Sequence, residues 1–386
     1  MMKKRTALTF VSLALMYSLL GVFVYFMPLM TDSLTEVTDF AVKASSPSYV
    51  ASQIKETLSC YIIAPDGNDN TTISDDDKQV MHSIIAKDSE DNTDITVTPD
   101  DIQELMKQAE EALNEEDAVG KTSEEPYHGG GTIITEGVNQ IQSKIPFDVY
   151  NPDIKKLLEQ DTDLSIGDKS KPTVLIYHSH TTEAYSLLDV GYYNSSDARS
   201  KNADRNMIRV GDELTRYLEK HGFVVIHDTE IHDEEYNSAY DNSREVVEKY
   251  LEEYPSIEIT IDVHRDDITY SDKTKVKPTA VINGKKAARM MIIAGCEYNR
   301  VKNFPNWEKN LRFDLQVQNK VNELYEGLMR PILFSERKYN MYETDYSFLL
   351  EVGTDANTLE EACYSARLFG DALGQLLNEK YVTKQE

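Results

Sequence analysis

From Lys171 to the C-terminus, short apolar runs alternate with longer stretches in which apolar residues recur every three or four positions. The apolar runs are rich in β-branched and aromatic residues and predict strands at 174–178, 223–228, 257–264 and 347–353, with a turn at Asn283-Gly284 before a further strand. The longer stretches predict helices at 203–221, 242–253, 306–330 and 359–377. This alternation predicts an α/β fold, with a mostly parallel sheet and helices on both faces.

Between residues 31 and 170 the chain is polar and acidic. One helix is predicted there, at Pro99–Ala118, with Thr98 as its N-cap and Pro99 at the first helical position. The rest of the region predicts an extended linker, because like charges along it repel one another. Such a linker either gives a folded domain reach from a membrane or is a solvated spacer with no length requirement.

An uncharged stretch, Ala7–Met27, follows Lys3, Lys4 and Arg5. At ~1.5 Å per residue, a helix of this length reaches roughly the ~30 Å of a bilayer core. We expect a single transmembrane anchor with a cytoplasmic N-terminus, because basic residues precede the span. A cleaved signal peptide is the alternative, but no small-x-small site follows the stretch. The expected domains are a cytoplasmic tip and anchor (1–30), an extracytoplasmic acidic linker region (31–170) and the α/β domain (171–386).

Charge is distributed unevenly along the chain. The formal net charge is −27, and residues 61–126 alone hold 19 acidic residues against four lysines. This balance argues against a nucleic-acid partner, because phosphate binding needs a basic face. The acidic segment is equally unsuited to bind an anionic polymer, so we expect it to act as a spacer.

The three cysteines, Cys60, Cys296 and Cys363, show no C-x-x-C spacing. An odd number allows at most one internal disulfide, and the spacing leaves open whether Cys296 and Cys363 form it. These two cysteines fall at a predicted strand end and in a predicted helix, so we expect ordinary core packing. We do not expect cysteine to bind a metal.

Two histidines and a glutamate follow the first predicted strand of the domain, within PTVLIYHSHTTEAY (172–185). Residues two apart on a strand share a face, so His178 and His180 are predicted to point the same way. Glu183 comes just after the strand, where a turn can bring it back toward His180. Imidazole nitrogen with one carboxylate is a ligand set that suits zinc. The alternative is a partly buried histidine pair beside a surface glutamate.

Two further strand ends carry polar residues. His264 ends the strand at 257–264, and Glu351 lies near the end of the strand at 347–353. If these strands are parallel neighbours, His180, Glu183, His264 and Glu351 meet at one edge of the sheet. Three of them would form a His, Glu, His metal site with an open position, and Glu351 would be the general base. This is the logic of amide hydrolysis by a zinc enzyme.

Other polar residues have two interpretations. Asp262 shares a face with His264 and either orients that histidine or is solvated. His264 could also be only a surface residue at a strand end, whereas Glu351 within an apolar run needs a partner. Three residues could contact a substrate or form surface salt bridges: Arg265, Asn310 and Arg312. The remaining histidines are treated as structural or given no role: His82, His128, His221, His227 and His232.

Four motifs occur in an order that resembles the stage II sporulation protein P family of endospore-forming bacteria: VLIYHSHTTEAY, IDVHRDD, FPNWEKNLRFDLQVQ and LLEVGTDANTLEEA. The resemblance covers the chain from about Lys171 onward. It implies a zinc N-acetylmuramoyl-L-alanine amidase that cuts the amide between muramic acid and the L-alanine of the stem peptide. Its zinc ligands match His180, Glu183 and His264, and its catalytic glutamate matches Glu351. His178 is left out of this ligand set, and Asp267 stands where we expect a small residue.

The resemblance also implies a biological setting. Such proteins are membrane-anchored and degrade septal peptidoglycan on the mother-cell side during engulfment, together with stage II sporulation proteins D and M. A stem-peptide endopeptidase activity is implied in addition. The remaining alternative is a non-catalytic wall-binding scaffold with a structural metal site, which usually has four protein ligands. His178 separates the two, because a fourth ligand there would favour the scaffold.

Overall fold

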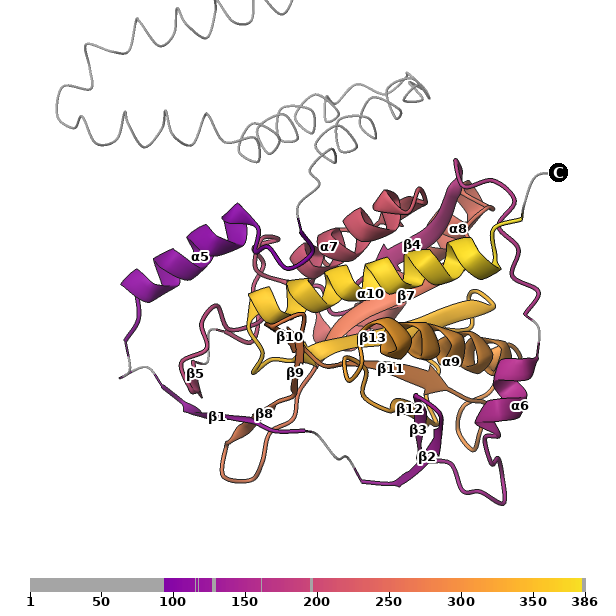
Figure 1. Cartoon of the computed structure of the whole chain (residues 1–386), viewed down its shortest axis with the longest axis horizontal. Coiled ribbons are helices and arrows are strands. Elements are labelled where there is room, and N and C mark those ends of the chain that lie inside the picture. Colours follow the sequence, from indigo (N-terminus) through magenta and orange to yellow (C-terminus); the bar gives the residue numbers. More distant parts are fainter. Residues whose placement is uncertain are drawn as a thin grey trace, which may run out of the picture. The chain divides into compact units, whose positions relative to one another are not determined.

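A mixed eight-stranded sheet forms the centre of the computed structural model (Figure 1), which describes residues 94–383 apart from 115, 117, 127–129, 161, 195 and 196. The strand order is β2-β3-β12-β11-β13-β7-β4-β6. Neighbours pair in parallel except β2 with β3 and β11 with β13, so the α/β prediction is confirmed. The strands are β2 (Thr132–Glu136), β3 (Asn139–Ser143), β4 (Pro172–Tyr177), β6 (Val224–His227), β7 (Ile259–Asp266), β11 (Met290–Gly295), β12 (Ile332–Ser335) and β13 (Tyr346–Thr354).

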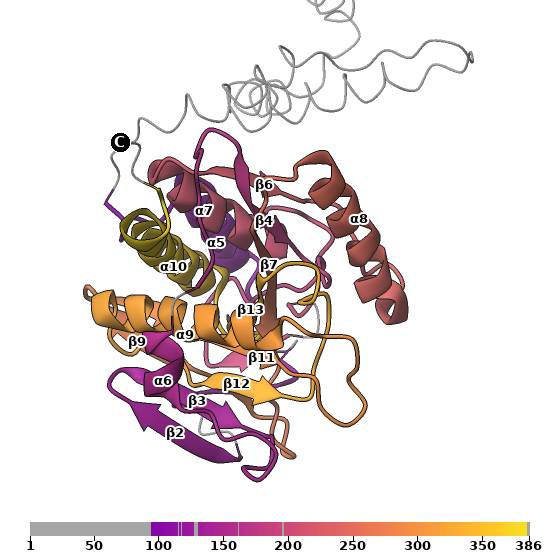
Figure 2. The same ribbon diagram turned by 90° about the vertical axis from the view of Figure 1, so that its right-hand side faces the viewer.

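Helices cover the two faces of this sheet unequally, as Figure 2 shows with the sheet seen nearly edge-on. One face carries α7 (Met207–Lys220), α9 (Trp307–Leu324) and α10 (Leu359–Lys380), and it contains the main hydrophobic core. The opposite face carries α8 (Ala239–Glu253), preceded by the short 3-10 helix η4 (Tyr236–Ser238). Side chains of β4 alternate between the two, with Val174 and Ile176 in the main core and Leu175 and Tyr177 against α8.

Most predicted elements are present, with shifted ends. The turn at Asn283-Gly284 joins β9 (Thr279–Ile282) to β10 (Lys285–Ala288), and both turn residues have positive φ, as a tight hairpin requires. Helix α9 ends at Leu324 and not at Arg330, because Gly327 takes a left-handed conformation and redirects the chain toward β11. A second small sheet has the order β5-β1-β8 and consists of β1 (Gly120–Glu124), β5 (Tyr192–Tyr193) and β8 (Lys275–Lys277).

The prediction of an extended linker is wrong for much of residues 94–170. Strands β2 and β3 extend the central sheet, since β3 pairs in parallel with β12 and β2 forms a hairpin with β3. Helix α6 (Ile154–Glu159) buries Ile154 and Leu157 beside α9. The polar composition of this region concealed these elements, because an edge strand needs only a few apolar residues on one face. The folded unit therefore begins well before residue 171.

The helix predicted at Pro99–Ala118 is present as α5 (Asp100–Glu111), with Pro99 and not Thr98 at the N-cap. Ile102 of α5 is fully buried, and Arg209 of α7 forms a 2.8 Å ion pair with Asp101. Thr98 instead bonds Glu360 of α10. These contacts dock α5 on the face that carries α7 and α10 (Figure 1).

Several predictions lie outside the described residues, namely the anchor at Ala7–Met27, Cys60, His82 and His128. Within the described part of the chain, no helix has the length and apolarity needed to cross a membrane. Cys296 and Cys363 are buried free thiols, which confirms their expected core packing.

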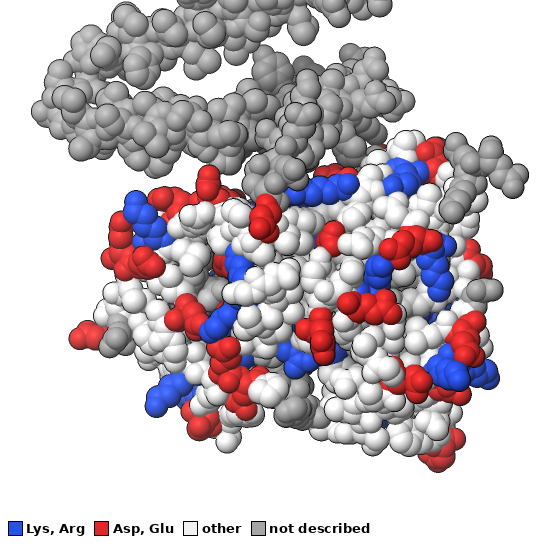
Figure 3. All heavy atoms as spheres, viewed as in Figure 1, with Lys and Arg blue, Asp and Glu red and all other residues white. Residues whose placement is uncertain are grey.

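The surface seen in Figure 3 mixes positive and negative side chains. Lysines and arginines lie beside acidic residues there. No broad basic field is visible on this face.

Candidate functional site

His264 and Glu351 lie side by side on the face of the sheet that carries α8. They are directly paired residues of the parallel strands β7 and β13. Their sequence neighbours Val263 and Leu350 point the other way, into the main core. The period of two along each strand therefore places a histidine and a glutamate together near the carboxyl ends of both strands.

The turn after β4 brings His180 and Glu183 to the same place. The ring centroid of His180 lies 5.3 Å from that of His264, and Glu183 Oε2 lies 3.4 Å from His264 Nδ1. The same Glu183 oxygen accepts a 3.2 Å hydrogen bond from the backbone N–H of Arg265. The four residues predicted from the sequence are thus brought together in the structure.

Burial and neighbouring charges shift the pKa values of Glu183 and Glu351 in opposite directions. Burial raises the pKa of Glu183, but His264 and Arg265 outweigh it and lower that pKa to about 2. Burial also raises the pKa of Glu351, and the nearby charge of Asp266 adds to it, so this pKa reaches about 8. Glu183 is therefore a carboxylate at neutral pH, whereas Glu351 titrates close to neutrality and can both take and release a proton.

The two histidines also differ. Burial and the neighbouring His264 lower the pKa of His180. Burial opposes the charged form of His264 as well, yet Asp262 and Glu183 hold its pKa well above the ordinary value. His180 Nδ1 and His264 Nε2 are buried and have no hydrogen-bond partner among the described residues. Unpartnered imidazole nitrogens in the interior need a ligand of some kind.

Asp262 contacts both the strand that carries His264 and the turn that carries His180. Its Oδ1 lies 2.8 Å from His264 Nε2, although the two atoms are not aligned as a hydrogen bond. Both oxygens of Asp262 accept hydrogen bonds from Ser179, one from the backbone N–H at 2.9 Å and one from the hydroxyl at 2.7 Å. Asp262 thereby ties the turn that carries His180 to the strand that carries His264, a role that the spacing left open.

His178 does not join the site, and the prediction that it points the same way as His180 is wrong. Strand β4 ends at Tyr177, so the turn that follows breaks the alternation. His178 is fully buried on the α7 side, where its Nδ1 donates to Val263 O at 2.9 Å and its Nε2 lies 2.9 Å from His227 Nε2. Burial and the adjacent His227 lower the pKa of His178 to about 3. A fourth metal ligand from this residue therefore has no support.

Aromatic side chains enclose the histidines, and the sequence pattern did not reveal them. Tyr236 stacks on His180 with ring centroids 4.5 Å apart. Tyr240 stacks with His264 at 6.1 Å and with Tyr339 at 4.8 Å. Tyr236 and Tyr240 are four residues apart where η4 runs into α8, a spacing that could have suggested a shared surface. Tyr339 comes from a distant segment, and no local signal connects it to the site.

Several residues with open roles have structural partners elsewhere. Asn310 donates to Met341 O at 2.7 Å, and Arg312 bonds Glu308 along α9. His221 pairs with Asp371, and His232 with Asp228. Arg265 stays near the site, where its side chain donates to the carbonyl oxygens of Ala184 and Ala198.

The chemistry of the donor set suits zinc, with two imidazoles and one ionised carboxylate. As they are placed, no three His, Cys, Asp or Glu side chains in the described part of the chain form a group close enough to hold a metal ion. The fit rests on the convergence of His180, Glu183 and His264 and on the buried Nδ1 of His180, which has no hydrogen-bond partner among the described residues.

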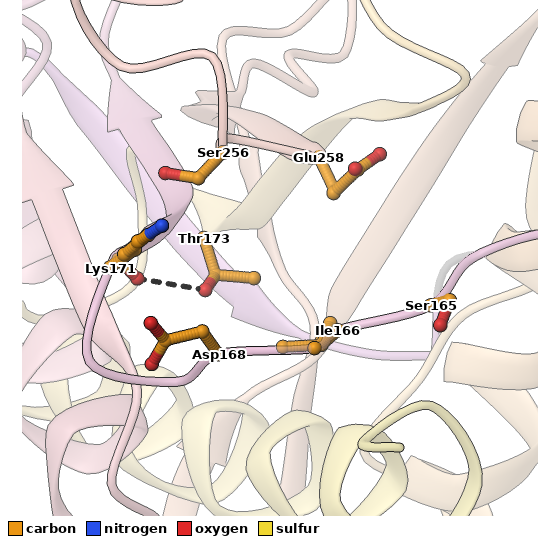
Figure 4. Close-up of a pocket in the computed structure, with 8 residues that line it drawn as sticks. Ser165, Ile166, Asp168, Lys171, Thr173, Ser256 and Glu258 are labelled. Atoms are coloured by element: carbon orange, nitrogen blue, oxygen red, sulfur yellow. Dashed lines mark hydrogen bonds between the residues drawn. The ribbon is translucent and has the colours of Figure 1, made fainter.

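A shallow polar pocket of about 200 Å³ lies at the opposite end of the same strands (Figure 4). Thr173, Ser256 and Glu258 line it near the starts of β4 and β7, and Asp168 and Lys171 complete one side. Ligand sites of α/β sheets lie at the carboxyl ends of strands. The converging residues, and not this pocket, are therefore the candidate site.

Comparisons with known proteins agree with this choice of family. Residues 48–374 match the model of the family described as Stage II sporulation protein P (SpoIIP). Stage II sporulation protein P of Bacillus subtilis (strain 168) is 31% identical over 223 residues, which are 54% of this chain and 52% of that protein. The match thus spans about half the length of this curated relative.

Solved structures give a weaker likeness. An N-acetylmuramoyl-L-alanine amidase, AmiC2 of Nostoc punctiforme, has a TM-score of 0.33 at 12% identity, covering 55% of this chain and 97% of its own. An N-acetylmuramoyl-L-alanine amidase from Clostridium difficile 630 has a TM-score of 0.31 at 16% identity, covering 53% and 95%. Because the family model matches most of the chain, including every residue of the candidate site, the protein belongs to the stage II sporulation protein P family.

Proposed function

We propose that this protein is a peptidoglycan hydrolase of sporulation, a zinc-dependent N-acetylmuramoyl-L-alanine amidase that releases stem peptides from glycan strands. Family membership supports the broad activity. The observation that carries the specific proposal is the pairing of Glu351 with His264 across β13 and β7, with Glu183 3.4 Å from the same histidine. A histidine–carboxylate group beside a second, protonatable carboxylate is suited to amide hydrolysis.

His180, Glu183 and His264 are the residues that would hold zinc. Zinc supplies a Lewis acid that polarises the scissile carbonyl. Glu183 is suited to be a metal ligand because its pKa of about 2 keeps it ionised. Asp262 and Ser179 orient the ligands, since Asp262 bonds the turn after β4 and contacts His264.

Glu351 would act as the general base and then as the general acid. It takes a proton from the attacking water and delivers it to the amine nitrogen as the carbon–nitrogen bond breaks. A pKa raised to about 8 by burial and Asp266 suits both steps, because a group that titrates near the working pH accepts and returns a proton readily.

We further propose that residues 7–27 anchor the chain in the cell membrane with the catalytic unit outside, as the apolar stretch and the preceding basic residues suggest. From this position the catalytic unit would act on the peptidoglycan of the septum. Stage II sporulation proteins D and M are the proposed partners, on the basis of the family resemblance alone.

The test is digestion of purified peptidoglycan by the full chain with and without a zinc chelator, followed by mass spectrometry of the released fragments. Free stem peptides that begin with L-alanine, lost on chelation, are expected. Glu351→Gln should abolish release and keep the bound zinc, and the exposed Glu326→Gln is the matched control. Cut cross-links with stems still attached would establish an endopeptidase instead. No release with zinc bound and both partners present would favour a scaffold.

A further inference from the structure

Arg199 lies directly beside the proposed metal ligands. It pairs with Glu183 in an isolated antiparallel bridge, and the neighbouring backbone bonds Ala184 N to Ala198 O at 3.1 Å and Ser200 N to Thr182 O at 2.8 Å. This short ladder fixes the backbone of Arg199 opposite the turn that carries Glu183. The position of Arg199 is therefore tied to the site itself.

Three contacts hold the guanidinium in place. Its Nη1 donates to Asp233 Oδ2 at 2.8 Å and to Thr182 Oγ1 at 3.0 Å, and the side chain of Asp233 has no exposed area. The guanidinium carbon lies 5.0 Å from the ring centroid of Tyr236, which itself stacks on His180. A guanidinium held by a buried carboxylate and an aromatic ring is preorganised, so binding a further group costs little side-chain entropy.

The same guanidinium keeps part of its binding capacity. Its hydrogen bonds to described residues use Nη1, and Nε and Nη2 have no acceptor among those residues. The side chain is 42% exposed. Arg265, by contrast, is buried, and its Nε and Nη2 donate hydrogen bonds to backbone carbonyl oxygens. Arg199 thus offers solvent a fork of donors of the kind that binds carboxylates.

The negative side chains near Arg199 give its guanidinium a role in binding an anionic ligand. Three carboxylates gather at the site, those of Glu183, Asp262 and Asp266. An anionic peptide would be repelled by this surrounding unless a cation met its carboxylate. A neutral peptide would have no use for the exposed donors of Arg199.

We infer that Arg199, supported by Tyr236 and Asp233, is a specificity residue that binds a free carboxylate on the peptide side of the scissile amide. This inference rests on the proposed function and refines it by naming the substrate class, an acidic peptide. Arg199 does not touch the reacting atoms in this role. Its loss affects binding of the acidic peptide more than turnover.

The experiment compares two muramyl peptides that differ only in the residue after L-alanine, which carries a free carboxylate in one and a carboxamide in the other. Dissociation constants are measured by calorimetry with the zinc-loaded full chain carrying Glu351→Gln, and kcat/KM is measured with Glu351 intact. We expect about tenfold tighter binding of the carboxylate peptide, the effect of one partly exposed charge-assisted pair. Arg199→Gln should remove this preference through KM, and Arg199→Lys should keep part of it.

Lys201→Gln is the matched control, because Lys201 lies two residues away and forms its ion pair with the exposed Glu234. It should leave both peptides unaffected. Equal binding of the two peptides by the parent chain, or an equal loss for both in Arg199→Gln, would overturn the inference, the latter by showing that Arg199 only supports Asp233. Arg199-dependent binding without any cleavage by the chain with Glu351 intact would refute the amidase and leave the carboxylate site standing.

Discussion

Replacing Glu351 by glutamine should stabilise the zinc-free protein, and increasingly so as the pH rises. Burial and Asp266 raise the pKa of Glu351 from 4.5 to about 8 in the folded chain. Between these two values the unfolded chain has lost the proton that the folded chain still binds. The free energy of unfolding of the parent protein therefore falls with rising pH across this window and levels off above it. Glutamine does not titrate and escapes this loss.

The size of the effect follows from the shift. One pKa unit corresponds to ~1.4 kcal/mol, so the full shift would amount to roughly 4 to 5 kcal/mol. Glu351 keeps part of its surface in contact with solvent, although its Oε2 is buried. We therefore expect about half of that value, ~2 kcal/mol in favour of the glutamine variant at pH 8, and close to none at pH 4.5.

Urea unfolding at pH 4.5, 6.5 and 8 in the presence of a chelator measures this difference. Trp307, the single tryptophan, packs against Tyr150 and Phe334 in the folded chain and reports the transition by fluorescence. Glu326→Gln is the control, because Glu326 is exposed and should shift nothing. A variant that is no more stable than the parent at pH 8, or whose advantage shrinks as the pH rises, would refute the argument that Glu351 is a desolvated carboxyl.

Other changes have equally definite outcomes. A chain beginning at Lys171 lacks β2, β3 and α5, so its melting temperature should fall by about 10 °C, roughly 3 kcal/mol or more, in a calorimetric scan against the full chain. An unchanged melting temperature would contradict their place in the fold. Gly211→Ala should cost about 1 to 3 kcal/mol in urea unfolding, because its new Cβ would lie 2.4 Å from His227 Nε2, whereas Gly167→Ala, with open space around it, should cost about nothing. His264→Ala should lose bound zinc and activity when metal content and peptide release are measured, and zinc retained there would move the site elsewhere.

The regular elements were predictable because their periodicity is strong. The strands β4, β7 and β13 are short runs rich in β-branched and aromatic residues, and the helices α7, α8 and α10 repeat their apolar residues about every 3.6 positions. Each of these elements was predicted to within a few residues of its true ends. Strands β2 and β3 were missed because they lie at an edge, where Ile134 and Ile141 supply most of the apolar contact within an otherwise polar and acidic region. Such edge strands are stabilised mainly by pairing with the neighbouring strand of the sheet. Their own sequence therefore carries little strand signal.

The candidate site shows the same limit at the scale of single side chains. His264 and Glu351 could be placed together because each sits inside a strand of clear register. His180 could not, because it lies in the turn after β4 ends at Tyr177, and this turn takes it away from the α7 side on which His178 continues the alternation of β4. The tyrosines that enclose the histidines come from η4, α8 and the segment before β13, so only the folded chain brings them together.

Register also explains the glycine that follows Glu351. A slip of one residue between β13 and β7 would turn Glu351 into the main core and Val352 into the site. The pairing is regular up to Glu351 and shifts only after it, before Thr354. Gly353 lies within this irregularity with a φ of 66°, and a Cβ there would come 2.5 Å from Asn357 Oδ1. A residue with a side chain at 353 would have to relieve both the backbone strain and the clash. The LLEVG stretch thus places the glutamate that pairs with His264 two residues before a glycine of positive φ, where the pairing of β13 with β7 becomes irregular.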